Sequence, residues 1–153
     1  MKRNESRPSP PLLIRQIGSF YRQLYRECAR IFKELEFPLE MDQIPVLLFL
    51  YYENGGSQQE ICVALQRDKA SVNRTVSLFV REEMTRVTHD VEDKRKTKVE
   101  LTERGKSLAK KANAIITEFD AGLTKVLSAE EKRQFHTLMH KLIDVKNSDH
   151  LNL

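Results

Sequence analysis

The stretch that decides the fold spans residues 68–101, DKASVNRTVSLFVREEMTRVTHDVEDKRKTKVEL. Its first part carries apolar residues at three- and four-residue steps, which predicts an amphipathic helix. Its second part holds two short runs enriched in threonine and valine, at 85–89 and 96–102, which predict strands. The segment between these runs is too polar to be buried, so we expect a charged loop that joins the two strands into a hairpin.

A two-stranded hairpin is not stable by itself in water, so it must rest on the preceding helices. The apolar stripe of the predicted helix comprises Val72, Val76, Phe79 and Val80. The opposite side carries small, hydrogen-bonding or basic residues: Ala70, Asn73, Arg74, Ser77 and Arg81. Such a face suits base edges and phosphates, although an amphipathic helix with a hydrated face shows the same pattern. A helix followed by a supported basic hairpin predicts a winged helix-turn-helix, mainly α with a small β-wing.

Long helices are predicted on both sides of this stretch. Over residues 12–35 the apolar residues recur at helical steps, and a helix of about 24 residues is about 36 Å long. This exceeds what a small core needs, so the excess apolar surface predicts a subunit interface. Towards the C-terminus, Thr102 is the expected N-cap of a helix that runs to about residue 127. A final helix follows, with apolar residues that are expected to face inward: Phe135, Leu138, Met139, Leu142 and Ile143.

Short-range signals divide the rest of the chain into elements. The run 46–50 is apolar nearly all round, which predicts a central buried helix over about 41–53. Ser57 and Glu60 form a capping box at the start of the next, short helix, and Asp68 is the expected N-cap of the helix after it. A second capping box, Ser128 to Glu131, opens the final helix.

Charge and composition restrict the classes of function. Residues 1–30 hold seven basic and two acidic residues, and residues 67–111 hold thirteen and eight, whereas 31–66 hold one and six. The positive excess therefore lies where a phosphate-binding surface would need it, with a hydrated basic face as the alternative. No apolar run of about 18 residues predicts a membrane span, and no apolar segment after the basic N-terminus predicts a secretory signal.

Reactive residue types give no catalytic or cofactor signature. The two cysteines make no disulfide framework, which favours a cytoplasmic protein. We find no set of nucleophile, base and orienting group, no glycine-rich phosphate loop and no paired carboxylates, so neither an enzyme nor a cofactor is expected. His136, His140 and Asp144 follow one another at four-residue steps, as metal ligands on a helix can, but a hydrated face is the favoured interpretation and no metal site is predicted.

The order of elements and four groups of residues resemble the MarR family of bacterial transcription regulators. The groups are Leu39 and Gln43 before Val46-Leu47; Ile61-Cys62 with Leu65; Ser71-Val72-Asn73-Arg74 with Val76 and Phe79; and Asp93-x-Arg95 followed by Leu101-Thr102-x-x-Gly105. The last group is the most specific, and the resemblance covers residues 12–147.

This resemblance implies a cytoplasmic homodimer that binds double-stranded DNA at a palindromic operator, as an effector-responsive repressor. Residues 12–36 and 103–147 would form the helical dimerisation region around a DNA-binding lobe at 37–102. Residues 1–11 would be a disordered arm and 148–153 a flexible tail. The alternative is a helical dimerisation or adaptor protein that keeps the winged-helix shape without binding DNA. The two differ in whether binding depends on DNA sequence and on salt.

The resemblance also implies site residues, and others follow from their place on the helix and loop. The expected DNA-binding set is Ser57, Gln58, Lys69, Ala70, Ser71, Asn73, Arg74, Ser77, Arg81, Lys94, Arg95 and Lys96. Arg95 would enter the minor groove, oriented by Asp93. A possible effector pocket involves Tyr21, Arg22 and Tyr25, with a place in the dimer interface as the alternative. Cys28 is a candidate redox sensor, although its position on the apolar stripe favours simple packing.

This sequence departs from the family pattern directly after the predicted recognition helix. The family usually has a glycine there, followed by an apolar pair and an arginine, whereas this chain has Glu83-Met84-Thr85-Arg86-Val87. Leu78 also stands where a polar residue is common. We expect the exit from this helix to be the least regular part of the lobe.

Overall fold

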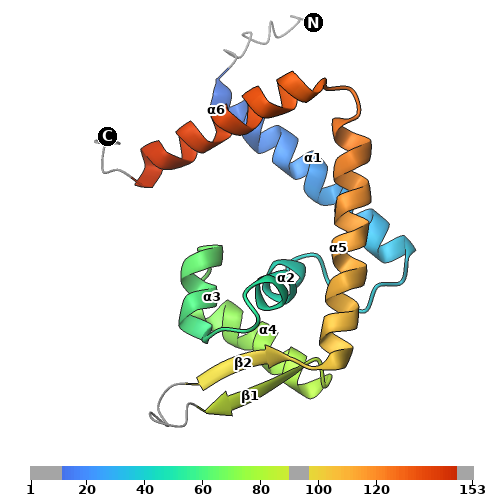
Figure 1. Ribbon diagram of the computed structural model, residues 1–153, viewed down its shortest axis with the longest axis vertical. Coiled ribbons are helices and arrows are strands. Elements are labelled where there is room, and N and C mark those ends of the chain that lie inside the picture. The colour runs from blue at the N-terminus through green and yellow to red at the C-terminus, as the bar shows by residue number, and fades with distance from the viewer. Residues whose placement is uncertain (1–11, 90–96, 148–153) are drawn as a thin grey trace, which may run out of the picture. The chain divides into compact units, whose positions relative to one another are not determined.

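In a computed structural model, residues 12–89 and 97–147 are described. The elements in chain order are α1 (Leu13–Glu34), α2 (Ile44–Tyr52), α3 (Gln58–Leu65), α4 (Lys69–Arg81), β1 (Thr85–His89), β2 (Thr97–Leu101), α5 (Glu103–Thr124) and α6 (Ala129–Asn147) (Figure 1). The predicted fold class, mainly α with a two-stranded wing, is confirmed. The chain divides into two compact units, Met1–Asn113 and Ala114–Leu153, so α5 begins in the first and ends in the second.

The core of the first unit is built around α2, as its sequence predicted. Val46, Leu47 and Leu50 are fully buried, while Leu48 and Phe49 are half-buried. Other elements contribute fully buried side chains to the same core: Ile61, Val72, Phe79, Met84 and Val99. Burial of each large apolar side chain contributes about 1.5–3 kcal/mol, so this core fixes α4 and the hairpin relative to α2.

The helices begin where the capping signals predicted. The Ser57 hydroxyl accepts the Glu60 amide and the Glu60 carboxylate accepts the Ser57 amide, which completes the capping box of α3. Asp68 accepts the amide of Ser71 at the start of α4, at 2.8 Å. Ser128 and Glu131 form the same reciprocal pair before α6. Helix α2 begins at Ile44, later than expected, because residues 41–43 form a turn before Pro45, which lies in its first turn.

Four helix ends use residues other than glycine in the left-handed conformation. Glu36, Asn54, Gln66 and Glu83, with φ between 49° and 56°, follow α1, α2, α3 and α4. At the end of α4 the amide of Met84 donates to Phe79 O at 2.8 Å and that of Glu83 to Val80 O at 3.0 Å. This is a Schellman motif, in which glycine is the usual residue at the left-handed position. Glu83 therefore makes the helix exit without the glycine that the family usually has.

The hairpin pairs β1 with β2 antiparallel, with Val87 opposite Val99. The inward-facing Val99 is fully buried and also forms a bridge to Gly56, with hydrogen bonds of 2.9 and 3.0 Å between their main chains. This bridge connects the wing to the segment between α2 and α3. The hairpin is thus supported by the helical lobe, as its small size requires.

The second unit comprises the end of α5 and helix α6. The prediction that the apolar side chains of α6 face inward is wrong for the single chain, where Phe135, Leu138, Leu142 and Ile143 are each at least 45% exposed. Periodicity shows which side of a helix is apolar but not what covers that side, and the described part of this unit leaves these side chains open to solvent. Helix α5 ends at Thr124, before the predicted residue 127. Among the described residues, no helix is long and apolar enough to span a membrane.

Candidate nucleic-acid interface

Helix α4 presents its polar face to solvent. Lys69, Ala70, Asn73, Arg74, Ser77 and Arg81 are exposed, whereas Val72, Val76 and Phe79 are buried. Two small residues in this set permit close approach of the helix to a ligand. The others are an amide and three cations, whose side chains can donate hydrogen bonds. Arg81 lies at the helix end and pairs with Glu82 at 3.3 Å. Arg74 lies in the second turn of α4 with its side chain exposed.

Ser71 differs from the other residues predicted to bind DNA on α4. It is half-buried, and its hydroxyl accepts a hydrogen bond from Arg67 Nη2 at 2.8 Å. Its amide donates to Asp68, and its carbonyl accepts the hydroxyl of the buried Thr75 at 3.2 Å. Accepting the Ser71 amide lowers the pKa of Asp68. Ser71 is therefore part of the structure that holds the helix start, a role that its place on the helix did not predict.

The N-terminus of α3 carries the other predicted contacts, Ser57 and Gln58, which are both half-buried. A helix N-terminus attracts phosphate through its free amides and its dipole. Here the Glu60 carboxylate lies 2.7 Å from the Ser57 amide, and that bond lowers the pKa of Glu60. The carboxylate therefore occupies part of the field that a phosphate would use at this end of α3.

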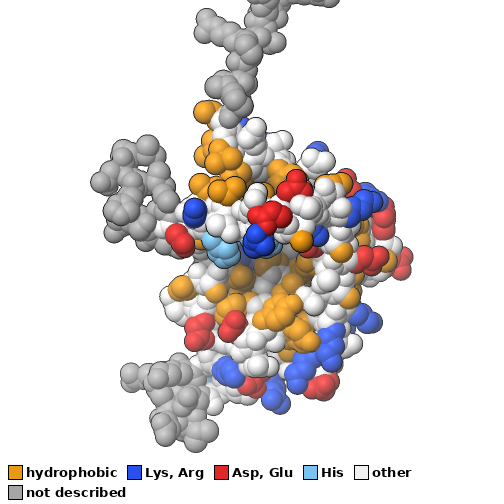
Figure 2. Space-filling model, turned by 45° about the horizontal axis from the view of Figure 1, so that its top comes forward, with side chains coloured by type: hydrophobic (Ala, Val, Ile, Leu, Met, Phe, Trp, Pro, Cys, Tyr) orange, Lys and Arg blue, Asp and Glu red, His pale blue; other side chains and the backbone are white. Residues whose placement is uncertain are grey.

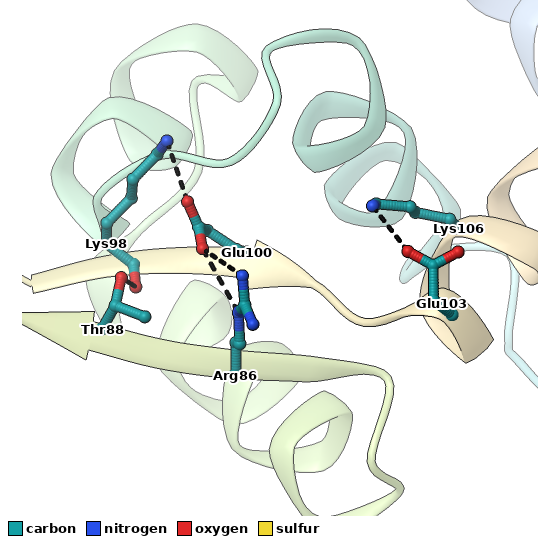
Figure 3. A network of polar contacts seen from close by, with 6 residues as sticks. All are labelled: Arg86, Thr88, Lys98, Glu100, Glu103 and Lys106. Atoms are coloured by element: carbon teal, nitrogen blue, oxygen red, sulfur yellow. Dashed lines mark hydrogen bonds and ion pairs between the residues drawn. The ribbon is translucent and has the colours of Figure 1, made fainter.

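The described base of the wing carries an ion-pair network (Figure 3). The Glu100 carboxylate lies 3.1 Å from Nζ of Lys98, which is on the same strand, and 3.1 Å from Nη2 of Arg86, which is on the neighbouring strand. The hydrogen bond from Lys98, and then that from Arg86, lower the pKa of Glu100. Arg86 and Lys98 were not predicted as site residues, although their outward positions at the base of the wing could have indicated them. The predicted tip residues Asp93, Lys94, Arg95 and Lys96 lie outside the described residues.

The secondary candidates differ in their surroundings. Cys28 is buried, and burial raises the pKa of its thiol, which disfavours the reactive thiolate and favours the packing interpretation. Tyr21 and Tyr25 form a tilted pair with ring centroids 6.2 Å apart and line a groove together with Arg22. All the residues of this groove belong to α1, so it has one wall in the described chain. His136, His140 and Asp144 are exposed, and the described residues include no group of three metal-ligating side chains.

These features define the class of the protein. An exposed polar face on α4, a preceding helix α3 joined to it by a tight turn, and a hairpin supported on the same core make up a winged helix-turn-helix. Proteins of this class place the second helix of the pair in the major groove of DNA.

Comparisons with known proteins identify the family that the chain resembles. The HTH-type transcriptional regulator BilQ of Clostridium symbiosum is 28% identical over 138 residues, which cover 88% of this chain and 96% of that protein. The crystal structure of a MarR/EmrR family transcriptional regulator from Acinetobacter sp. ADP1 matches with a TM-score of 0.78 and 27% identity, over 88% of this chain and 94% of that one. No protein-family model matches the sequence.

A third relative is known in complex with DNA. MepR of S. aureus, whose structure was solved as a DNA complex, matches with a TM-score of 0.77 at 21% identity, over 87% of this chain and 97% of that one. At this identity the match concerns the fold alone. Together the comparisons confirm the predicted resemblance: the chain has the fold of the MarR family regulators, is similar to them in sequence, and this similarity supports a DNA-binding regulator.

Proposed function

We propose that this protein is a transcriptional repressor that binds a palindromic operator as a homodimer and releases it in response to an effector. The exposed face of α4 carries this proposal. Asn73 and Arg74 project from a helix whose other side is fixed by the buried Val72, Val76 and Phe79. A rigid support of this kind holds hydrogen-bonding side chains in one geometry, which is what discrimination among base edges requires.

The homodimer accounts for apolar surface that the single chain leaves exposed. On α1 this surface comprises Leu13, Ile14, Ile17, Phe20 and Tyr21, and on the second unit Val126, Phe135, Leu138, Leu142 and Ile143. On the face shown in Figure 2, apolar side chains gather at the end of α1 next to the grey N-terminal segment. Large exposed apolar patches mark interaction surfaces. We assign residues 12–36 and 103–147 to this interface and residues 37–102 to the DNA-binding lobe.

The effector would act by binding one of two conformations better than the other. The groove beside Tyr21, Arg22 and Tyr25 is the candidate for its site, and a second copy could supply the missing wall. The protein would act in the cytoplasm without a cofactor and without catalytic activity. A dimeric adaptor that does not bind DNA is the competing function, because the exposed apolar surfaces fit it equally well.

Fluorescence anisotropy with DNA from the protein's own upstream region separates the two functions. A regulator should prefer that DNA over a shuffled sequence, and log K should fall linearly with log salt, by about 0.9 for each phosphate neutralised. Equal binding to both sequences with a slope near zero would leave only the adaptor.

Arg74→Ala tests the proposed role of α4. If Arg74 contacts a base, the change should weaken operator binding by about 1–3 kcal/mol and relax preference at one position of the operator. Arg30→Ala is the matched control, because it removes the same charge from the side of α1 opposite the apolar residues of the proposed interface, where Arg30 pairs with Glu27 and Glu34 on the exposed surface. Equal affinity losses in the two variants would mean that net charge alone matters.

A further inference from the structure

Arg67 lies in the turn between α3 and α4, and its guanidinium donates hydrogen bonds to two separate partners. Nη1 donates to the main-chain carbonyl of Asp42 at 2.5 Å, and Nη2 donates to the Ser71 hydroxyl at 2.8 Å. Nη2 also lies 3.7 Å from the Asp42 carboxylate, and only 22% of the Arg67 side chain is exposed. Arginines of DNA-binding proteins often contact phosphate. The guanidinium of Arg67 instead bonds to partners within the protein.

The two partners of Arg67 belong to different parts of the lobe. Asp42 lies in the turn at 41–43, directly before α2 and after the segment that leaves α1. Ser71 lies in the first turn of α4, where its amide and carbonyl are already bonded to Asp68 and Thr75. Arg67 therefore joins the segment between α1 and α2 to the start of the helix that carries Asn73 and Arg74.

We infer that Arg67 is a positioning residue, which fixes the start of α4 against the segment between α1 and α2 and does not bind phosphate. This inference rests on the proposed DNA binding. The planar guanidinium can donate from two nitrogens in fixed directions, whereas a lysine ammonium is a point charge that cannot reproduce this arrangement. Movement of the segment after α1 would be transmitted through the same bonds to Ser71 and the exposed face of α4.

Arg67→Lys and Arg67→Ala distinguish a positioning role from a phosphate contact. If Arg67 positions α4, both variants should bind operator about tenfold or more weakly, with the salt slope of the wild type, because no phosphate contact is lost. If Arg67 contacts phosphate, the lysine variant should keep most of the affinity, and the alanine variant should lose about 0.9 from the slope. The second pattern would overturn the inference.

Ser71→Ala removes one partner without changing charge. It should also weaken operator binding, and adding it to Arg67→Lys should cost little more than Arg67→Lys alone, because the bond that Ser71→Ala removes is already lost in Arg67→Lys. Asp42→Asn is the control: the main-chain carbonyl remains, so operator affinity should change less than twofold. Additive losses from Arg67→Lys and Ser71→Ala would contradict the inference.

Hydrogen exchange without DNA makes the inference testable independently of the proposed function. The amides of residues 71–74 should exchange faster in Arg67→Lys than in the wild type, while those of the buried β2 strand stay unchanged. Unchanged exchange at 71–74 would count against the positioning role. If wild-type protein shows no sequence preference for DNA, the proposed function fails, whereas accelerated exchange in the variant would still support the link between Arg67 and α4.

Discussion

Glu83 occupies a backbone conformation that residues with a Cβ adopt at a cost, whereas glycine adopts it readily. Its φ is +56°, and it holds the left-handed position of the Schellman motif that ends α4. Its carbonyl accepts the Thr102 hydroxyl at 2.7 Å, so this turn also joins the end of α4 to the start of α5. Met84 and Phe79, which this motif joins through their main chains, are both fully buried, and their burial holds the unfavourable residue in place.

Glu83→Gly should therefore stabilise the protein. A left-handed residue costs about 1–2 kcal/mol, and the greater freedom of glycine in the unfolded chain offsets about 0.5–1 kcal/mol of that, so the free energy of unfolding should rise by up to about 1.5 kcal/mol. Urea unfolding of both proteins at the same concentration measures this change in the free energy of unfolding. The matched control is Glu82→Gly, because Glu82 has φ −86° and gains no relief, so that variant should be destabilised. Destabilisation by both glycines would show that Glu83 is not strained.

Asp68 gives the start of α4 a dependence on pH. Its folded-state pKa is lowered, chiefly because the carboxylate accepts the Ser71 amide. A lowered folded-state pKa means that the contribution to stability is complete above the ordinary aspartate pKa. It is lost as pH falls through that value and then through the folded-state pKa.

Asp68→Asn should reduce this pH dependence while keeping the cap, since asparagine also accepts the amide but does not titrate. Urea unfolding at about pH 6 and about pH 3 should show a smaller loss of stability on acidification in the variant than in the wild type. Asp120→Asn is a control with the same change in charge, at an exposed carboxylate inside α5 rather than at a helix start. Identical acid sensitivity of wild type and Asp68→Asn would refute a titrating cap.

At the scale of elements, the sequence predicted contacts between residues close together in the chain but not contacts between residues far apart in it. The caps at Ser57, Asp68 and Ser128 were predictable because acceptor and donor lie three residues apart. The bond from Arg67 to Asp42 spans 25 residues and depends on how α2, α3 and α4 pack, which no periodicity encodes. The separate hydrogen bond from Arg67 to the Ser71 hydroxyl was also missed, because the same packing orients the guanidinium.

The glycine in the motif Leu101-Thr102-x-x-Gly105 is explained by the contact between α5 and the end of α4. A Cβ at Gly105 would lie 2.1 Å from the carbonyl oxygen of Met84 and 3.1 Å from Leu101 Cδ2. The same carbonyl accepts the amide of Thr102 at 3.0 Å, so it cannot move away without losing that bond. The wing and α5 can meet the end of α4 this closely only where no side chain intervenes.

Gly105→Ala should destabilise the protein by about 1–3 kcal/mol, the usual range for overpacking a closed contact. Gly122→Ala is the control within the same helix, because nothing lies within 4 Å of the added Cβ. It should raise stability by about 0.5–1 kcal/mol through helix propensity. Thermal unfolding of both variants, at one protein concentration, measures the contrast. A Gly105→Ala variant as stable as the wild type would mean that the contact with Met84 is loose.

At the scale of the whole molecule, the exposed apolar residues were predicted as an interface from helix length alone. The central helix was predictable because a run that is apolar on all sides must be buried on all sides. The apolar side of α6 was placed inward by the same reasoning, which could not distinguish burial in the chain's own core from burial against another copy. Only the structure shows that Phe135 and Leu138 are more than half exposed among the residues it describes.

Ile17→Glu should shift the proposed dimer towards monomer. Ile17 is at the centre of the α1 apolar stripe and 40% exposed, so a glutamate there would bury an unpaired charge in the interface. Analytical ultracentrifugation should show a higher dissociation constant, and operator affinity should fall because two half-sites can no longer be bound together. Gln23→Glu places the same charge on the exposed polar side of α1 and should leave both unchanged. If Ile17→Glu remains dimeric at low micromolar concentration, α1 does not form the interface, and the exposed residues of α6 become the surface to change next.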